Sequence, residues 1–179
     1  MKNLLFAVFA LVSVSATAQI KWMTLEEAVA AQAQEPKKIM MDVYTNWCGP
    51  CKMLDKMTFT NEDLVAYVNE NFYAVKFNAE GDSVLTYKGK EYANPNYDPE
   101  REFKRNYPHE FSQYMGIRGY PAIVFMDEDA NFITPVTGFM TAQQLEVYLK
   151  LFGENTYKEV RTKEQFKEYE QNFEPEFKT

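Results

Sequence analysis

Histidine and cysteine are scarce in this chain: His109 is the one histidine, and Cys48 and Cys51 are the only cysteines. A zinc site would therefore need carboxylates among its four ligands. Basic residues are outnumbered by acidic ones, 19 to 26. This acidic balance argues against nucleic acid or an anionic membrane surface as a partner. The chain also has no internal repeat and no low-complexity segment.

Long apolar runs are absent except at the N-terminus. The N-terminus has the layout of a secretory signal peptide. It contains one lysine, Lys2, then an apolar run over Leu4–Val12 and the small-residue pattern Ala16-Thr17-Ala18. The run is too short to span a bilayer, although a buried N-terminal strand or helix is the alternative. We therefore predict a signal peptide over residues 1–18 and one exported domain over 19–179, periplasmic or secreted and not inserted in the membrane.

The two cysteines are separated by two residues, in the motif Cys48-Gly49-Pro50-Cys51. A structural disulfide stabilises mainly by closing a long loop of the unfolded chain, and this loop is very short. In an oxidising compartment the pair is better interpreted as a working redox pair. Two other interpretations stay open: a non-catalytic surface disulfide, and a zinc site completed by carboxylates.

The pattern of apolar residues and caps predicts an α/β domain. A βαβ unit followed by a late β-hairpin and a helix implies a mixed central sheet with helices on both faces. The expected strands are 39–44, 72–77, 121–126 and 132–137, and the expected helices are 24–34, 50–54, one capped by Thr60 or Asn61, 141–152 and 162–172.

Residues 79–113 are rich in proline, glycine and tyrosine and show no sustained period. Within them, Ser83–Tyr92 predicts a small hairpin that turns at Lys88-Gly89, and Glu100–Tyr107 predicts a short helix that ends before Pro108. Residues 154–179 form a C-terminal helical extension. The single histidine, His109, is expected to be an ordinary surface or turn residue.

The chemistry of the motif follows from its place at a helix start. Proline suits the first turn of a helix, and the free amides and dipole at that end stabilise a thiolate on Cys48. Cys51 lies one turn further on, within reach of Cys48. A thiolate attacks a partner disulfide, and the neighbouring thiol then resolves the mixed disulfide.

These residues resemble the thioredoxin family. The matching motifs are Asp42-x5-Cys48-Gly49-Pro50-Cys51, Lys76 on the next strand, the loop Gly116–Pro121 and Gly138. The resemblance covers about 21–78 and 114–153 and implies a thioredoxin fold, with 79–113 as an insertion before the cis-proline loop. The segment Lys21–Asn78 also resembles exported thioredoxin-like domains, among them the periplasmic C-terminal domains of membrane thiol–disulfide electron transporters.

The resemblance implies a role for each matching residue. Cys48 is the nucleophile, Cys51 the resolving thiol, and Asp42 a buried carboxylate that assists deprotonation of Cys51. Burial in an apolar strand is expected to raise the Asp42 pKa toward neutral. Lys76 either pairs with Asp42 or extends its ammonium to solvent as a strand lysine.

Further residues are implied on the substrate side of the motif. A cis Pro121 leaves the backbone of Tyr120 free to pair with a substrate strand, and Gly49, Pro50 and Gly138 flank the substrate groove. Trp47 either shields the disulfide or packs structurally. Tyrosines of the insertion either form a recognition surface or, as we favour, pack the insertion against the core; they are Tyr87, Tyr92, Tyr97 and Tyr107.

We interpret the chain as an exported thiol–disulfide oxidoreductase that acts on protein disulfides without a cofactor or metal. Reduction is the favoured direction, because strong oxidants of this family carry a histidine where Gly49-Pro50 stands. The chain has no FAD or NAD fingerprint and no second redox motif, so a membrane electron donor is implied. The alternatives are an oxidase or isomerase for folding proteins, and a redox-tuned binding module without turnover.

Overall fold

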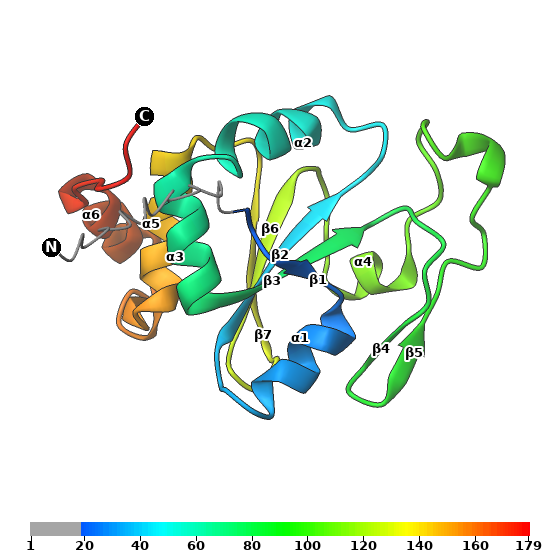
Figure 1. The fold of residues 1–179 in the computed structure, drawn as a ribbon, viewed down its shortest axis with the longest axis horizontal. Helices are drawn as coiled ribbons and strands as arrows, with labels where there is room; N and C mark the ends of the chain where they lie inside the picture. The colour runs from blue at the N-terminus through cyan, green and yellow to red at the C-terminus, as the bar shows by residue number, and fades with distance from the viewer. Residues whose placement is uncertain (1–18) are drawn as a thin grey trace, which may run out of the picture.

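A computed structural model describes residues 19–179, so the predicted signal peptide lies outside the described residues. A five-stranded sheet with the order β1-β3-β2-β6-β7 forms the centre of the molecule (Figure 1). The parallel pairs are β1–β3 and β2–β3, and the antiparallel pairs are β2–β6 and β6–β7. This confirms the mixed sheet. The strands are Trp22–Met23 (β1), Lys38–Tyr44 (β2), Phe72–Asn78 (β3), Ala122–Met126 (β6) and Phe132–Thr137 (β7).

Helices cover both faces of the sheet. The α-helices are Leu25–Gln32 (α1), Gly49–Met53 (α2), Glu62–Asn71 (α3), Glu110–Tyr114 (α4), Ala142–Gly153 (α5) and Lys163–Asn172 (α6). One π-helical turn at Leu54–Thr58 continues α2, and 3₁₀ turns occupy Pro99–Arg101 and Thr156–Lys158.

The central strand β2 is apolar on both sides because each side faces a separate core. Met40 packs in the core under α3 and α5, and the next residue, Met41, packs in the core under α1 and α4. Both methionines are fully buried. Alternation along the strand then places Asp42 on the same side as Met40, toward the segment that follows the Cys48 motif.

The helix starts follow the predicted caps. Capping boxes with both hydrogen bonds begin α1 at Thr24, α5 at Thr141 and α6 at Thr162. Asn61, not Thr60, caps α3 by accepting from the amide of Leu64 at 3.0 Å. Local chemistry therefore sets these boundaries.

The insertion contains the predicted hairpin but not the predicted helix. Leu85–Tyr87 (β4) pairs with Lys90–Tyr92 (β5) around Lys88 and Gly89, both with positive φ. The helix expected at 100–107 is wrong: only the 3₁₀ turn Pro99–Arg101 forms there, and the helix of this region is α4, after Pro108. Asn106 is the physical reason, because its side chain bonds the backbone of Asp98 and its amide donates to Glu80, which holds the segment in a non-helical path.

His109 is fully buried, so its assignment as a surface or turn residue is wrong. It is the N-cap of α4, with Nδ1 accepting from the amide of Phe111 at 3.0 Å and Nε2 lying 2.7 Å from the carbonyl oxygen of Ser83. Its ring also packs edge-on against Phe77. A polar ring with both nitrogens engaged can be buried at little cost, and the sequence gives no sign of those partners.

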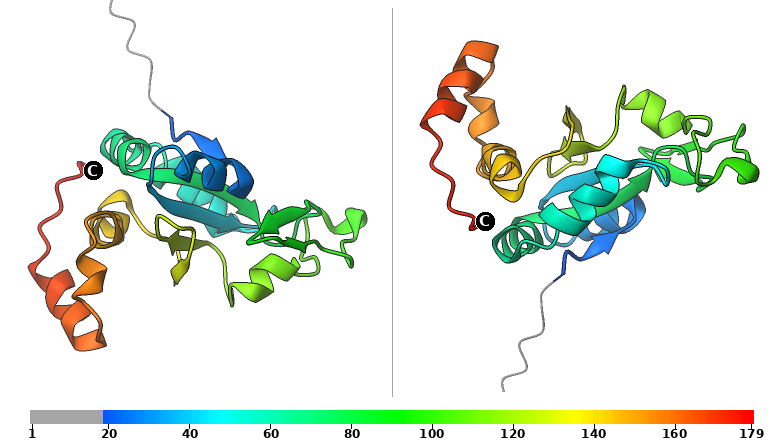
Figure 2. Two further views of the ribbon diagram at one scale, coloured as in Figure 1. Left: turned by 90° about the horizontal axis from the view of Figure 1, so that it is seen from below. Right: turned by 90° about the horizontal axis from the view of Figure 1, so that it is seen from above.

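The insertion and the C-terminal extension lie at opposite ends of the sheet (Figure 2). Tyr87 and Tyr92 of the insertion are buried, while Tyr97 is half-buried and Tyr107 exposed. The packing role therefore holds for the two hairpin tyrosines. Within residues 19–179, no helix is both long enough and apolar enough to cross a membrane.

Candidate active site

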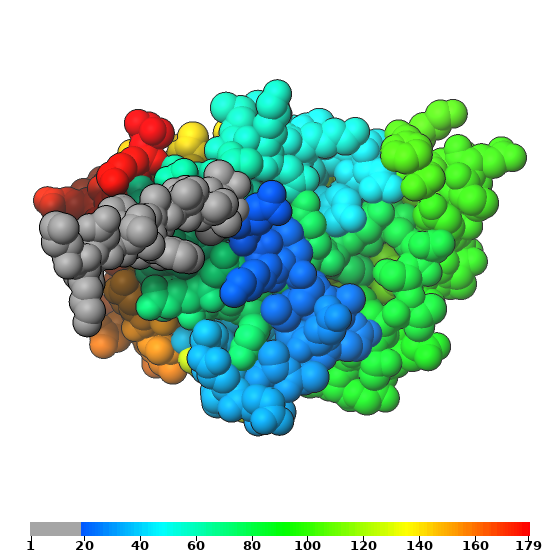
Figure 3. All heavy atoms as spheres, in the orientation of Figure 1, coloured from blue at the N-terminus to red at the C-terminus, as the bar shows by residue number. Residues whose placement is uncertain are grey.

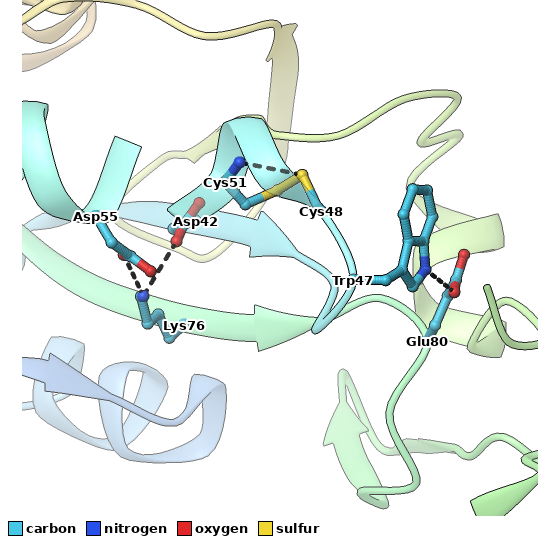
Figure 4. The surroundings of a disulfide bond; sticks show 7 residues. All are labelled: Asp42, Trp47, Cys48, Cys51, Asp55, Lys76 and Glu80. Atoms are coloured by element: carbon cyan, nitrogen blue, oxygen red, sulfur yellow. Dashed lines mark hydrogen bonds and ion pairs between the residues drawn. A yellow bond between two sulfur atoms is a disulfide. The ribbon is translucent and has the colours of Figure 1, made fainter. Parts of the chain in front are cut away.

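Cys48 and Cys51 form a disulfide where β2 passes into α2 (Figure 4). Their Cα atoms are 5.3 Å apart. Cys48 is the N-cap of α2, and its Sγ accepts a hydrogen bond from the amide of Cys51 at 3.1 Å. An amide directed at a sulfur stabilises negative charge on it, so this geometry favours a thiolate on Cys48 in the reduced protein.

Exposure does not distinguish the two cysteines of the oxidised form. Cys48 is 2% and Cys51 3% exposed. The exposed part of the motif is Gly49 and Pro50, which form its outer surface, and a Cβ atom at Gly49 would meet no other atom within 4 Å. The surface that Gly49 and Pro50 offer to a partner protein therefore carries no polar or charged side chain.

Asp42, on β2, is among the residues that surround the disulfide (Figure 4) and is 1% exposed. Its burial raises the pKa of the carboxyl from 3.8 to about 7, opposed by the Lys76 ammonium and assisted by the negative charge of Asp55. Oδ1 of Asp42 has no hydrogen-bond partner in the described structure. A carboxyl that titrates near neutral pH can accept and return a proton during a reaction.

Lys76 lies between two carboxylates. It is paired in register with Asp42 across β2 and β3, with Nζ 3.6 Å from Oδ2 of Asp42, and it also forms a hydrogen-bonded ion pair with Asp55. The same ammonium lies 5.3 Å from the ring centre of Trp22 and 5.1 Å from that of Tyr44. Of the two alternatives for Lys76, the structure thus shows the ion pair with Asp42.

Asp55 is a further charged residue of the site that was not predicted from the sequence. It lies four residues after Cys51, about one helical turn further along the same segment. That spacing was the signal available in the sequence. Asp55 adds a second negative charge beside Asp42 and shares its cation, so the three side chains form one connected ion-pair group (Figure 4).

The loop that ends in Pro121 lies at the same end of the sheet. The Tyr120–Pro121 peptide bond is cis, as the resemblance implied. Among residues 19–179, the backbone N–H and C=O of Tyr120 make no hydrogen bond. Gly138 donates from its amide to the carbonyl of Pro121 at 2.9 Å, with a φ of 117° that favours glycine.

Trp47 points away from the disulfide and toward Glu80 (Figure 4). Its Nε1 donates to Oε2 of Glu80 at 2.6 Å, and its ring packs edge-on against Tyr120. Glu80 was not found by sequence analysis, because only the folded chain brings it to Trp47. This geometry favours the packing alternative for Trp47 over a shield of the disulfide.

The alternative of a zinc site finds no ligand set in the described part of the chain, where no three His, Cys, Asp or Glu side chains are grouped to hold a metal ion. Both cysteines are bonded to each other. The two nitrogens of His109 contact the backbone of the insertion and of α4.

The family model for a thioredoxin-like domain matches residues 25–153. The chain belongs to the thioredoxin-like family. With the bonded pair Cys48–Cys51, this membership places it among the thioredoxin-like thiol–disulfide oxidoreductases, as the sequence predicted.

Curated relatives share part of their length with this chain. It is 31% identical over 126 residues to the thiol:disulfide interchange protein DsbD of Yersinia pestis, covering 69% of this chain and 17% of that protein. It is 27% identical over 123 residues to DsbD of Haemophilus ducreyi, covering 65% and 17%. The chain thus spans less than a fifth of the length of these relatives.

Solved structures share the fold. A thioredoxin-fold protein from Helicobacter pylori gives a TM-score of 0.55 at 18% identity, with 88% of this chain and 87% of that chain covered. A putative disulphide-isomerase from Bacteroides thetaiotaomicron gives 0.53 at 24% identity, with 79% and 98% covered. These similarities support the thioredoxin fold and nothing more specific.

Proposed function

We propose that the protein is an exported reductase of protein disulfides and that Cys48 is its nucleophile. The observation that carries this proposal is the hydrogen bond from the Cys51 amide to Cys48 Sγ at the start of α2. It gives the two sulfurs different environments. Cys48 is the sulfur whose negative charge is stabilised, and Cys51 is the one that needs a base.

The reaction starts from the reduced protein. The Cys48 thiolate attacks one sulfur of a partner disulfide, which forms a mixed disulfide and releases the partner's other sulfur as a thiolate. Cys51 then loses its proton to Asp42 and attacks Cys48 Sγ. This step releases the second partner thiolate and forms the Cys48–Cys51 disulfide. The partner gains two electrons, and the protein loses two.

The direction of electron flow follows from what surrounds Cys48. Oxidants of this fold stabilise their reduced thiolate strongly, which makes the disulfide a good electron acceptor. Gly49 and Pro50 supply no side chain for that purpose. We therefore expect a potential nearer the ~−270 mV of thioredoxin than the ~−120 mV of strong oxidants.

A reductase outside the cytoplasm needs electrons from elsewhere. The chain has no nucleotide-binding fingerprint, and its curated relatives are named thiol:disulfide interchange proteins. We propose a membrane protein as the donor, with export directed by the signal peptide at residues 1–18. The substrates are disulfides of other exported proteins.

The experiment is a measurement of potential joined to a turnover assay. Equilibration of the protein with glutathione buffers, followed by alkylation and mass analysis of the thiols, gives the potential. A value below about −230 mV and catalytic reduction of a protein disulfide support the proposal, whereas a value above about −170 mV favours an oxidase or isomerase. Trapping with Cys51→Ser identifies the partners. Partner binding that is equal in oxidised, reduced and Cys48→Ser forms, without turnover, would show a binding module instead.

A further inference from the structure

A groove of about 540 Å³ lies beside the active-site loop. Its aromatic walls are Trp47, the residue before Cys48, and Tyr120, the residue before Pro121. Arg105 comes from the insertion, and Arg118 comes from the loop before Tyr120. In the space-filling view, the insertion meets the segment between β2 and α2 (Figure 3). The groove is therefore built jointly by the thioredoxin-like part and by the insertion.

Both arginines are exposed and free of acidic partners. Within residues 19–179, neither guanidinium lies within 4 Å of a carboxylate. Acidic residues outnumber basic ones in this protein, whereas the residues that line this groove include two arginines and a single carboxylate, Glu80. The groove is therefore a local departure from the overall charge. Exposed guanidinium groups are well suited to bind carboxylates in a bidentate arrangement.

Glu80 fixes the shape of this groove. It is 8% exposed, and its Oε2 accepts from Nε1 of Trp47 at 2.6 Å and from the amide of Asn106 at 2.7 Å. Arg105 directly precedes Asn106, and its guanidinium lies 5.1 Å from the ring centre of Trp47. Oε2 of Glu80 accepts from two N–H donors, and within residues 19–179 no ion pair joins Glu80 to Arg105, so the guanidinium of Arg105 stays available to a ligand.

We propose that this groove binds an acidic residue of the partner protein, next to the partner's reacting cysteine. The inference rests on the proposed function, because it names the class of disulfide substrate that the site selects. Trp47 directly precedes Cys48, and adjacent Cα atoms are about 3.8 Å apart. When a cysteine of the partner is bonded to Cys48, partner side chains within about two residues of that cysteine can therefore reach the groove. Tyr120 lines the same groove, and its backbone N–H and C=O, which have no partner among residues 19–179, can hold an extended partner segment.

The test uses two synthetic peptide disulfides that differ only beside the cysteine, one with glutamates and one with glutamines. Reduced protein is mixed with each peptide in a stopped-flow instrument at pH 7 and low salt, and the second-order rate constants are compared. We expect the acidic peptide to react about fivefold faster, as one or two partly exposed ion pairs would give. The preference should shrink at 0.5 M salt, since exposed charges are screened.

Variants separate the groove from general charge effects. Arg118→Gln and Arg105→Gln should each lower the acidic-to-neutral rate ratio, and the double variant should bring it close to one. Arg161→Gln is the matched control, because Arg161 is an exposed arginine that contacts the Lys158 carbonyl beyond α5. It should keep the wild-type ratio.

Equal rates for the two peptides with the wild-type protein would overturn the inference and leave the reductase intact. The inference would also fail if Arg118→Gln and Arg105→Gln slowed both peptides equally, because the arginines would then act on the Cys48 thiolate. If neither peptide were reduced at all, the proposed function itself would fail. The three results are therefore distinguishable.

Discussion

Lys76 and Asp42 face each other in register on neighbouring parallel strands, with 3.6 Å between Nζ and Oδ2, yet Lys76 also binds Asp55. The cation is thereby shared between a buried and a half-exposed carboxylate. Its attraction for Asp42 lowers the pKa of that group but does not overcome burial, which holds the pKa at about 7. The protein retains a carboxyl that changes charge near neutral pH next to its redox pair.

This carboxyl makes the stability of the oxidised protein depend on pH. The Asp42 pKa is raised from 3.8 to about 7, so the folded protein holds a proton that the unfolded chain loses. Stability should therefore fall as pH rises from about 4 to 7, by on the order of 2–4 kcal/mol from this group. Asp42→Asn should remove this fall, and should stabilise the protein at pH 8 much more than at pH 4.5.

Denaturant unfolding of both proteins at the two pH values measures the effect. Asp129→Asn is a matched control, since Asp129 is exposed in the turn between β6 and β7. If Asp42→Asn raised the free energy of unfolding equally at pH 4.5 and pH 8, the result would contradict a buried Asp42 carboxyl that titrates near pH 7.

Asp42→Asn should also separate the two steps of disulfide reduction. The carboxylate is proposed to take the proton of Cys51, so resolution of the mixed disulfide should slow by about a hundredfold, the lower end of the range for general-base catalysis. The first attack by Cys48 should change less. Stopped-flow reduction of a model disulfide resolves the two phases, and unchanged kinetics in both at pH 7 would remove Asp42 from the mechanism.

Cys48 should be the more reactive thiol of the reduced protein. Its Sγ receives the Cys51 amide at the start of α2, which lowers the pKa of a thiol there below the free value of about 8.5. Alkylation by iodoacetamide across pH 4–9, with the labelled position found by peptide mass analysis, tests this. Faster labelling at Cys51 would reverse the assignment of nucleophile and resolving thiol.

We expect Glu80 to stabilise the folded protein mainly as a hydrogen-bond acceptor and less through its negative charge. Glu80→Ala leaves Nε1 of Trp47 and the amide of Asn106 without their partner, which should cost about 1–3 kcal/mol for each group that stays dry. Glu80→Gln keeps an acceptor oxygen and should cost clearly less. Denaturant unfolding gives both free energies, and the indole fluorescence reports whether Trp47 moves. Equal losses in the two variants would show that the negative charge itself holds the insertion.

The local features of this fold were available in the sequence. The Cys48–Cys51 spacing, the apolar run of β2 and the capping boxes at Thr24, Thr141 and Thr162 each depend on residues within a few positions of one another. Such features form through backbone preferences and short-range hydrogen bonds, so the pattern of residues determines them. The hairpin turn at Lys88-Gly89 belongs to the same class.

Tertiary structure alone decided the features that join distant segments. Glu80 meets Trp47 across 33 positions, and His109 is buried against Ser83 across 26. The helix expected at 100–107 was lost because Asn106 found partners in Asp98 and Glu80 that outweigh a weak local preference. The redox motif could thus be read from the chain itself, whereas the groove beside it exists only once β2, the insertion and the loop before Pro121 have come together.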